Sequence, residues 1–261
     1  MVPFPALQDE QGKYLIEKHT ILTAPSIQVL DLTRKLRQAQ TPNFASFPNL
    51  VVGNPTMPSV PPKTGEKAQQ LPTLPGAEKE AIAIAPLLHT KAIIGSQGTK
   101  AAIVQKMPKA RIIHLATHGL LDNFGSGVPG AIALAPDPSP SSAPKPGEIN
   151  GLLTAEEILD MKLLAELVVL SACDTGRGRI TGDGVIGLSR SFISAGVPSV
   201  MVSLWSVPDA STAELMTQFY KDFQQHHLDK ATALRHAMLT TMKTHSNPRD
   251  WAAFTLIGES K

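Results

Sequence analysis

The stretch VVLSACDTG, from Val168 to Gly176, joins an apolar run to a glycine-rich tract and contains the only cysteine of the 261-residue chain, Cys173. The run of four apolar residues at 167–170 predicts a buried strand that ends close to this cysteine. A lone cysteine on an apolar strand is more often a packing residue than a nucleophile. The surrounding sequence therefore has to distinguish a displayed thiol from a buried one.

Strands and helices alternate on both sides of this stretch. Apolar patterns predict strands at 49–52, 111–116, 131–134, 167–172, 199–205 and 252–258. Helical patterns cover 77–88, 100–107, a segment beginning at 154, 184–195, about 209–223 and 230–244. This alternation predicts an α/β domain with a mostly parallel central sheet. Reactive groups in such sheets lie just beyond the carboxyl ends of the strands, and Cys173 occupies such a position.

Several helix boundaries carry recognisable local signals. Thr99 is predicted to cap the helix at 100–107, and Pro86 is predicted to kink or end the preceding helix. Thr154 and Glu157 have the spacing of a capping box. Asp209 is predicted to cap the helix that follows it.

We expect a single domain over residues 1–261. The proline-rich segment 41–75 contains eight prolines, and the segment 125–148 contains six. Proline, serine and glycine at this density are typical of surface segments, so we interpret both as surface excursions from the domain.

Composition excludes several classes of partner. The net charge is +2 and aromatic residues make up 5%, which argues against a nucleic-acid surface or an anionic membrane as partner. One cysteine forms no internal disulfide, which favours a reducing compartment. The N-terminus lacks the features of a signal peptide, and no apolar run approaches the ~20 residues of a membrane span. We therefore expect a cytoplasmic protein.

His118 is the histidine best placed to activate Cys173. It lies where the apolar run at 111–116 ends, and Gly119, which follows it, would let a substrate approach the backbone closely. His118 and Cys173 thus lie at the carboxyl ends of two predicted strands, and the two side chains meet if those strands are neighbours. His114 is predicted to be a core histidine with a backbone partner.

Three other histidines, His226, His227 and His245, are predicted to be solvated on the surface. A metal site is disfavoured, because His114 and His118 on one strand would lie ~13 Å apart. A nucleotide site at 176–184 remains a weaker hypothesis, since the third glycine of a dinucleotide turn is replaced by Thr181. A serine-hydrolase elbow also fails, because Ser191 stands where the second glycine is needed. We therefore expect no cofactor and no metal.

A His-Gly pair at one strand end, with cysteine about 50 residues later at another, is the caspase-type arrangement. The chain resembles the CHAT domain, a caspase-like family that often accompanies tetratricopeptide repeats. The matching segments are ARIIHLATHG, GLLTAEEILDMKL, LVVLSACDTGRG, GDGVIGLSRSFISAGVPSVMVSLWSVPD and, more weakly, GKYLIEKHTI and LPGAEKEA. The fold implied by this resemblance is a caspase-like three-layer α/β/α sandwich with a mostly parallel central sheet.

The resemblance also assigns roles to residues of this chain. It makes Cys173 the nucleophile and His118 the general base and later the general acid. It places the backbone N–H groups of Gly119 and Cys173 in the oxyanion hole. The caspase signature Q-A-C-x-G is replaced here by SACDTG, without the glutamine, so aspartate specificity is not implied.

Charged residues flank the expected cleft. Asp174 and Asp183 could recognise a basic side chain of a substrate, and Arg177 or Arg190 an acidic one. Solvated loop charges or local ion pairs are an equally good interpretation of these residues.

Two functions follow from the resemblance. The first is a cysteine endopeptidase that cleaves protein or peptide substrates through a thioester intermediate. The alternative is a signalling or scaffold domain without turnover that acts through protein–protein contacts. The expected partner is a tetratricopeptide-repeat region, on this polypeptide or on another one.

Overall fold

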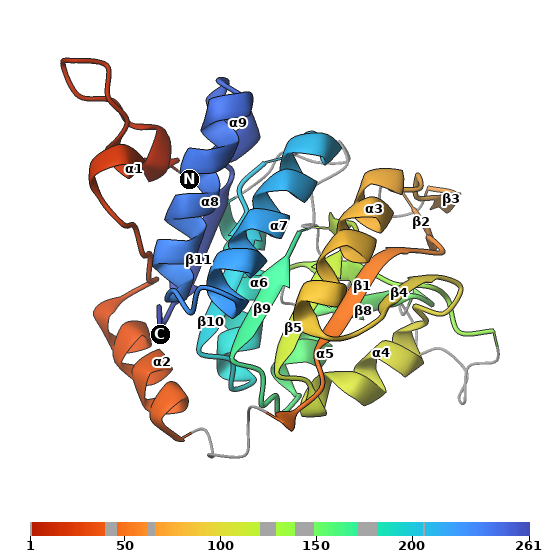
Figure 1. Ribbon diagram of the computed structural model, residues 1–261. Helices are drawn as coiled ribbons and strands as arrows, with labels where there is room; N and C mark the ends of the chain where they lie inside the picture. Colours follow the sequence, from red (N-terminus) through yellow and green to blue (C-terminus); the bar gives the residue numbers. More distant parts are fainter. Residues whose placement is uncertain are drawn as a thin grey trace.

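The computed structural model describes residues 2–39, 46–61, 66–120, 129–138, 149–171, 182–205 and 207–261, with only the backbone described at 182–186. Its centre is a six-stranded sheet (Figure 1). The strands are β1 (Leu50–Pro55), β4 (Ala92–Gly95), β5 (Ile112–Ala116), β9 (Leu167–Leu170), β10 (Ser199–Ser203) and β11 (Phe254–Gly258). Their order is β11-β10-β9-β5-β1-β4, and every neighbouring pair is parallel except β10–β11. The predicted, mostly parallel sheet is confirmed.

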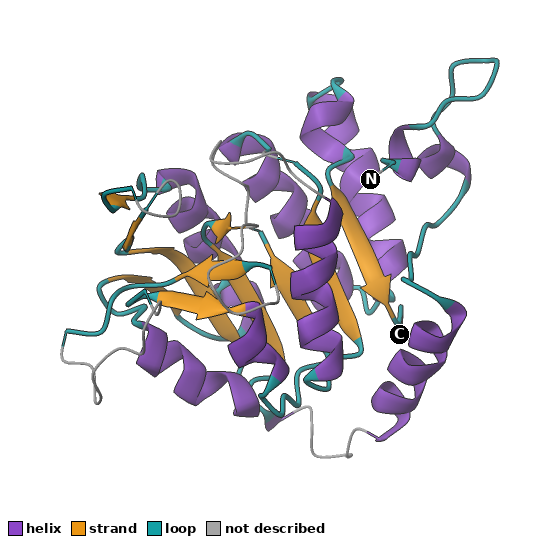
Figure 2. Cartoon of the chain, turned by 180° about the vertical axis from the view of Figure 1, so that it is seen from behind, coloured by secondary structure: helices purple, strands orange, loops and turns teal. Residues whose placement is uncertain are grey.

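Helices cover both faces of the sheet. One face carries α3 (Pro75–Ile84), α7 (Asp209–Gln224) and α8 (Lys230–Thr244), drawn in front in Figure 1. The other carries α4 (Lys100–Lys106), α5 (Ala155–Leu159) and α6 (Gly182–Ser194), seen from behind in Figure 2. Side chains that alternate along each strand enter two separate hydrophobic clusters, one under each helical layer. A parallel sheet needs apolar cover on both faces, and the result is a three-layer sandwich.

Smaller elements surround this sandwich. They are α1 (Leu15–Lys18), α2 (Ile27–Ala39), α9 (Pro248–Trp251), the hairpin β2 (Ser59–Val60) and β3 (Gln69–Gln70), and the antiparallel sheet of β6 (Gly119–Leu120), β7 (Ala131–Ala133) and β8 (Leu152–Thr154). Strand β6 begins directly after His118, so this small sheet is joined to the carboxyl end of β5. Among the helices that the structure describes, none combines the length and the apolar character needed to cross a membrane.

Most local predictions are confirmed. Thr99 Oγ1 accepts a hydrogen bond from the Ala102 N–H at 3.3 Å, which caps α4. The capping box of α5 is complete, since the Thr154 N–H donates to Glu157 at 2.9 Å and the Glu157 N–H donates back to Thr154 Oγ1 at 3.3 Å. Helix α3 ends at Ile84, and a short 3₁₀ turn at Pro86–Leu88 follows.

Asp209 was predicted to cap α7, and this is wrong. The residue before the helix is Pro208, whose extended backbone begins the first turn, and Asp209 is already helical. The Asp209 carboxylate instead lies against Gly76 in the first turn of α3, where a Cβ would be 1.9 Å from the Asp209 Cγ.

The two proline-rich segments are not wholly surface excursions. The first contains β1, a central strand, and also the buried residues Met57, Val60 and Leu71. The second contains β7, which is fully buried. Prolines lie beside these strands, with Pro55 as the last residue of β1 and Pro129 and Pro136 on either side of β7. Proline removes a ladder donor, so it marks strand ends without preventing the strands themselves.

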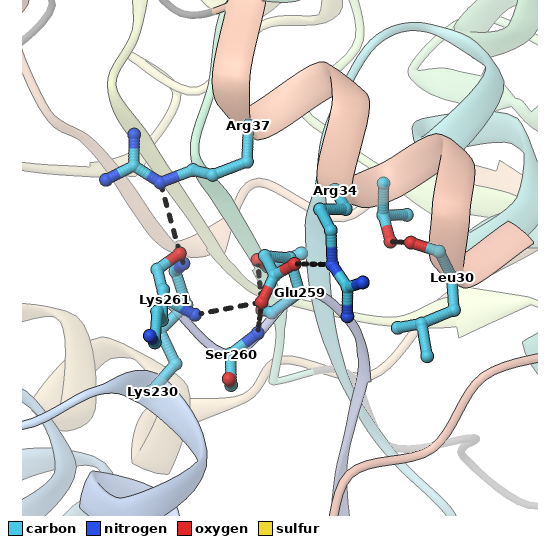
Figure 3. Close-up of polar contacts among 9 residues, drawn as sticks. Leu30, Arg34, Arg37, Lys230, Glu259, Ser260 and Lys261 are labelled. Atoms are coloured by element: carbon cyan, nitrogen blue, oxygen red, sulfur yellow. Dashed lines mark hydrogen bonds and ion pairs between the residues drawn. The ribbon is translucent and has the colours of Figure 1, made fainter.

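Helix α2 is attached to the end of β11 through polar contacts (Figure 3). Arg34 Nε lies 3.8 Å from Glu259 Oε2, and Arg37 Nε donates to the Lys261 carbonyl at 3.1 Å. The backbone N–H groups of Ser260 and Lys261 donate to Glu259 Oε1. Lys230, at the start of α8, donates to the same Lys261 carbonyl although its side chain is buried.

Burial lowers the pKa of Lys230 from its ordinary value of 10.5 to about 8, although Glu166 and Glu259 act in the opposite direction. Below pH 8 the ammonium is charged in both the folded and the unfolded state, so the cost of burying it is fully present. Between about pH 8 and 10.5 the unfolded state binds more protons, and the stability contributed by this residue rises with pH. Relative to Lys230→Met, the wild type should therefore gain up to about 3 kcal/mol of unfolding free energy across this window.

Urea unfolding at a series of pH values from 7 to 10.5 measures this difference. The exposed Lys243 on the same helix supplies the control, and Lys243→Met should show no such pH dependence. A wild-type minus Lys230→Met difference that stays flat from pH 7 to 10.5 would contradict the prediction.

Candidate active site

Strands β5 and β9 lie side by side and in parallel, so their carboxyl ends meet at one edge of the sheet. Their register pairs Ile112 with Leu167 and Leu115 with Leu170, a constant offset of 55 residues. His118 follows Leu115 by three residues, and Cys173 follows Leu170 by three residues, so the same offset separates them. Cys173 itself lies outside the described residues. The condition stated from the sequence, that the two strands are neighbours in the sheet, is met.

His118 is buried, and its ring is oriented by a backbone carbonyl. Nε2 lies 2.7 Å from the carbonyl oxygen of Pro72, in the segment that leads into α3. A carbonyl oxygen only accepts, so Nε2 carries the proton. The neutral ring then has its lone pair on Nδ1, which is the nitrogen able to take up a proton. Pro72 was not identified from the sequence, because a backbone carbonyl has no sequence signature.

Gly119 lies at the first position of β6, opposite Ile132 of β7. The Ala133 N–H donates to the His118 carbonyl at 2.9 Å, which makes His118 and Ala133 a hydrogen-bonded position of the antiparallel ladder. The next position along such a ladder is not hydrogen-bonded, so the N–H of Gly119 points away from β7. Thr117, beside His118, is held by its hydroxyl, which donates to the Ala133 carbonyl at 2.7 Å.

The remaining sequence candidates are described only in part. Asp174 and Arg177 lie outside the described residues. Asp183 lies in the first turn of α6, where the backbone alone is described, and Arg190 is exposed on the same helix. Most of the glycine-rich tract at 176–184 is likewise outside the described residues.

An open groove lies at the same edge of the sheet, beyond β10. It has a volume of about 410 Å³ and is lined by Pro3, Ala6, Trp205, Pro248 and Arg249. Trp205 follows β10 by two residues, and its Nε1 donates to the Arg249 carbonyl at 2.9 Å. Strand β10, which precedes Trp205, is the neighbour of β9 in the sheet.

His114 is buried as predicted, but its partners are side chains, which corrects the predicted backbone partner. Its Nδ1 lies 3.1 Å from the Tyr220 hydroxyl, and its Nε2 lies 3.0 Å from Glu80 Oε1. Burial raises the pKa of Tyr220 well above its ordinary value, and the nearby charge of Glu80 acts in the same direction. The Tyr220 hydroxyl therefore keeps its proton. Glu80 was not identified from the sequence, where it lies within an ordinary helical pattern.

Of the three histidines predicted to be solvated, His226 and His227 are exposed and His245 is partly buried. His226 also donates to the buried carboxylate of Asp222 at 2.8 Å, as does His236 at 2.7 Å, and both of these side chains are more than half exposed. Burial acts to raise the pKa of Asp222, but hydrogen bonds from Gln218, His226 and His236 outweigh it and lower the pKa. His245 pairs with Glu214 at 3.2 Å. Within the described ranges, no three His, Cys, Asp or Glu side chains are grouped so that they could hold a metal ion.

The chain matches the family model of the CHAT domain over residues 1–259. It is 32% identical, over an alignment 288 positions long, to tetratricopeptide repeat protein 28 of Mus musculus, with 98% of this chain and 12% of that protein aligned. The corresponding protein of Homo sapiens is 31% identical, with 99% and 11% aligned. The chain therefore spans only a small part of the length of these two relatives.

Among solved structures, the Arg-specific cysteine proteinase gingipain R superposes with a TM-score of 0.57, covering 89% of this chain and 51% of that chain at 10% identity. The complex of the Porphyromonas gingivalis RgpB pro- and mature domains gives a TM-score of 0.52, covering 89% and 52% at 11% identity. These likenesses show a shared caspase-like fold. Together with the match of the family model to almost the entire chain, the His-Gly strand end and the three-layer sandwich lead to one conclusion: the chain belongs to the CHAT domain family.

Proposed function

We propose that this chain is a cysteine endopeptidase of caspase-like type, with Cys173 as nucleophile and His118 as general base. The observation that carries the proposal is the register of β5 and β9, whose offset of 55 residues equals the separation of His118 and Cys173. The bond from His118 Nε2 to the Pro72 carbonyl supports it further, because it leaves Nδ1 as the basic nitrogen.

The reaction proceeds in two halves. The Cys173 thiol gives its proton to His118 Nδ1, and the thiolate attacks the carbonyl carbon of the scissile peptide bond. The resulting oxyanion is stabilised by the backbone N–H groups of Gly119 and Cys173. When the tetrahedral species collapses, the C–N bond breaks, the amine takes the proton from His118, and a thioester remains. A water molecule then gives a proton to His118 and attacks the thioester, which releases the acid and restores the thiol.

The Pro72 carbonyl has a defined role in this cycle. His118 alternates between the neutral ring and the imidazolium, and both forms keep a proton on Nε2. The bond to Pro72 therefore persists in both forms and holds the ring in one orientation while Nδ1 gains and loses its proton.

Substrate recognition is assigned to acidic residues next to the nucleophile. Asp174 and Asp183 recognise a basic side chain on the amino-terminal side of the cleaved bond, and the groove at Trp205 receives a neighbouring part of the peptide. The chain acts in the cytoplasm on protein substrates, together with a tetratricopeptide-repeat region.

A peptide library tests this function. The wild type should cleave peptides after a basic residue. The Cys173→Ala variant should not cleave them, because no thioester can form without the Cys173 thiol. Circular dichroism and the melting temperature should show that the variant is folded. Cleavage that persists in Cys173→Ala, or the absence of cleavage of every library member by the wild type, would contradict the proposal.

A second candidate is a scaffold domain that acts without turnover. The observation that favours it is that the two matched relatives are tetratricopeptide repeat proteins, of which the part aligned with this chain is 12% and 11%. In this case Cys173→Ala would leave binding to a repeat region unchanged, as measured by isothermal titration calorimetry, and the wild type would cleave nothing.

A further inference from the structure

Helix α3 and the segment before it contact both strands that lead to the proposed dyad. Pro72, three residues before the helix, accepts the hydrogen bond from His118. In the second turn of the helix, Glu80 accepts a hydrogen bond from Ser171 Oγ at 3.0 Å. Ser171 is the residue that follows β9, and Cys173 is two residues further along the chain. Helix α3 and the segment before it therefore contact His118 and also the residue that follows β9.

Glu80 lies in a buried polar network that crosses the core. It is 2% exposed, Ser171 is 6% exposed, and His114 and Tyr220 are inaccessible to solvent. The Glu80 carboxylate accepts a hydrogen bond from Ser171 Oγ, and its Oε1 lies 3.0 Å from His114 Nε2. The other ring nitrogen of His114, Nδ1, lies 3.1 Å from the Tyr220 hydroxyl. Burying a carboxylate costs free energy unless polar partners lie beside it, as Ser171 and His114 lie beside Glu80. A role for the Glu80 carboxylate would explain why the fold keeps it buried.

Helix α3 is itself fixed against the sheet. A Cβ at Gly53 of β1 would lie 2.4 Å from the Ala81 Cβ and 2.5 Å from the Ala77 carbonyl oxygen, so the helix backbone packs directly on the strand. Asn54, which has a positive φ of 44°, donates to Glu78 at 2.9 Å and accepts from the Leu74 N–H at 2.8 Å. These contacts prevent the helix from sliding along the strand, so Pro72 and Glu80 keep a constant separation.

We propose that Glu80 is a positioning residue for the dyad: it holds Ser171 and thereby sets where the strand end that leads to Cys173 lies relative to His118. This inference rests on the proposed peptidase function. It differs from a purely structural role, in which the network only offsets the burial of its own members. The strand end is the only part of the network that leads to the nucleophile, so changes near Ser171 should affect chemistry, whereas changes at Tyr220 should affect stability alone.

Glu80→Gln keeps the shape of the side chain but replaces one carboxylate oxygen by an amide NH₂ group and removes the charge, which weakens the acceptor that Ser171 uses. A displacement of about 1 Å at a reacting group costs up to roughly 100-fold in rate. We expect kcat for peptide cleavage to fall by roughly 10- to 100-fold with KM within about threefold of the wild type, since substrate binding is untouched. Ser171→Ala removes the same hydrogen bond but leaves the Glu80 carboxylate in place, and it should lower kcat by roughly tenfold.

Two matched variants separate positioning from stability. Tyr220→Phe removes the far end of the network and leaves the bond between Glu80 and Ser171 in place. Glu78→Gln makes the same chemical change on the same helix outside the network, where the amide oxygen can still accept from Asn54. Both should keep kcat within about threefold of the wild type, although Tyr220→Phe should lower the melting temperature.

The rate at which iodoacetamide alkylates Cys173, the single cysteine, distinguishes a failure of the positioning role from a failure of the peptidase function. If alkylation and cleavage depend on His118 but kcat is equal in Glu80→Gln, Ser171→Ala and Tyr220→Phe, the positioning role is overturned and the peptidase stands. If neither depends on His118, the peptidase fails and the positioning role fails with it. If Glu80→Gln does not fold, Ser171→Ala against Tyr220→Phe decides in the same way.

Discussion

Replacing His118 by alanine should lower kcat for peptide cleavage by about 10²- to 10⁴-fold, the range that a positioned general acid–base group contributes. Two steps of the proposed cycle lose their proton acceptor, and two lose their proton donor. The alkylation rate of Cys173 by iodoacetamide at pH 6–7 should also fall by at least about tenfold, because a free thiol with a pKa of about 8.5 is mostly protonated there. Steady-state kinetics and mass spectrometry of the alkylated protein measure the two effects.

His19→Ala is the matched control for this experiment. His19 is exposed at the end of α1, so its removal should change neither kcat nor alkylation. An alkylation rate that is the same in the wild type and in His118→Ala, together with unchanged cleavage, would show that His118 does not activate the thiol.

The largest effect on stability is expected from Phe219→Ala, which should lower the free energy of unfolding by about 3–5 kcal/mol. Phe219 is fully buried on α7, in the cluster between the helices and the sheet. Its ring meets Tyr220 edge-on at 5.0 Å and stacks on Phe223 at 5.9 Å. Truncation to alanine removes this apolar area and leaves a cavity in a close-packed region, and the surrounding backbone can fill it only in part.

Phe223→Ala, one turn further along the same helix, is the control. Phe223 is only partly buried, so its loss should cost clearly less than the loss of Phe219. Guanidinium unfolding followed by circular dichroism gives both values. Equal losses for the two variants, or a loss below about 1 kcal/mol for Phe219→Ala, would contradict the packing described for this face of the sheet.

Sequence patterns predict the central sheet well because its strands are short, apolar and bounded by strong local signals. The strand at β5 and the capping box at Thr154 are examples, since every residue needed to recognise them lies within a few positions. Helix α2 was missed for the opposite reason. It lies at the edge of the sheet, Thr33 is its one fully buried residue, and its many polar and charged residues give it a low mean hydropathy. Strand β4, at the other edge, is only half-buried along its whole length.

The residues of the candidate site likewise include some that local sequence patterns predict and some that they do not. His118, Gly119 and Cys173 are recognisable because a short motif marks each strand end. Pro72 and Glu80 are not, because they reach His118 and Ser171 across 46 and 91 residues of sequence. Contacts of this kind depend on how α3 is seated against β1, and no local pattern encodes that arrangement.

The distance between Cys173 Sγ and His118 Nδ1, measured in a crystal structure of the protein, tests the account most directly. The proposed dyad predicts a separation of roughly 3–4 Å, the spacing of an activated nucleophile and its base. A separation of more than about 8 Å in both the free protein and a complex with a peptide inhibitor would contradict it, because no proton could then pass between the two side chains.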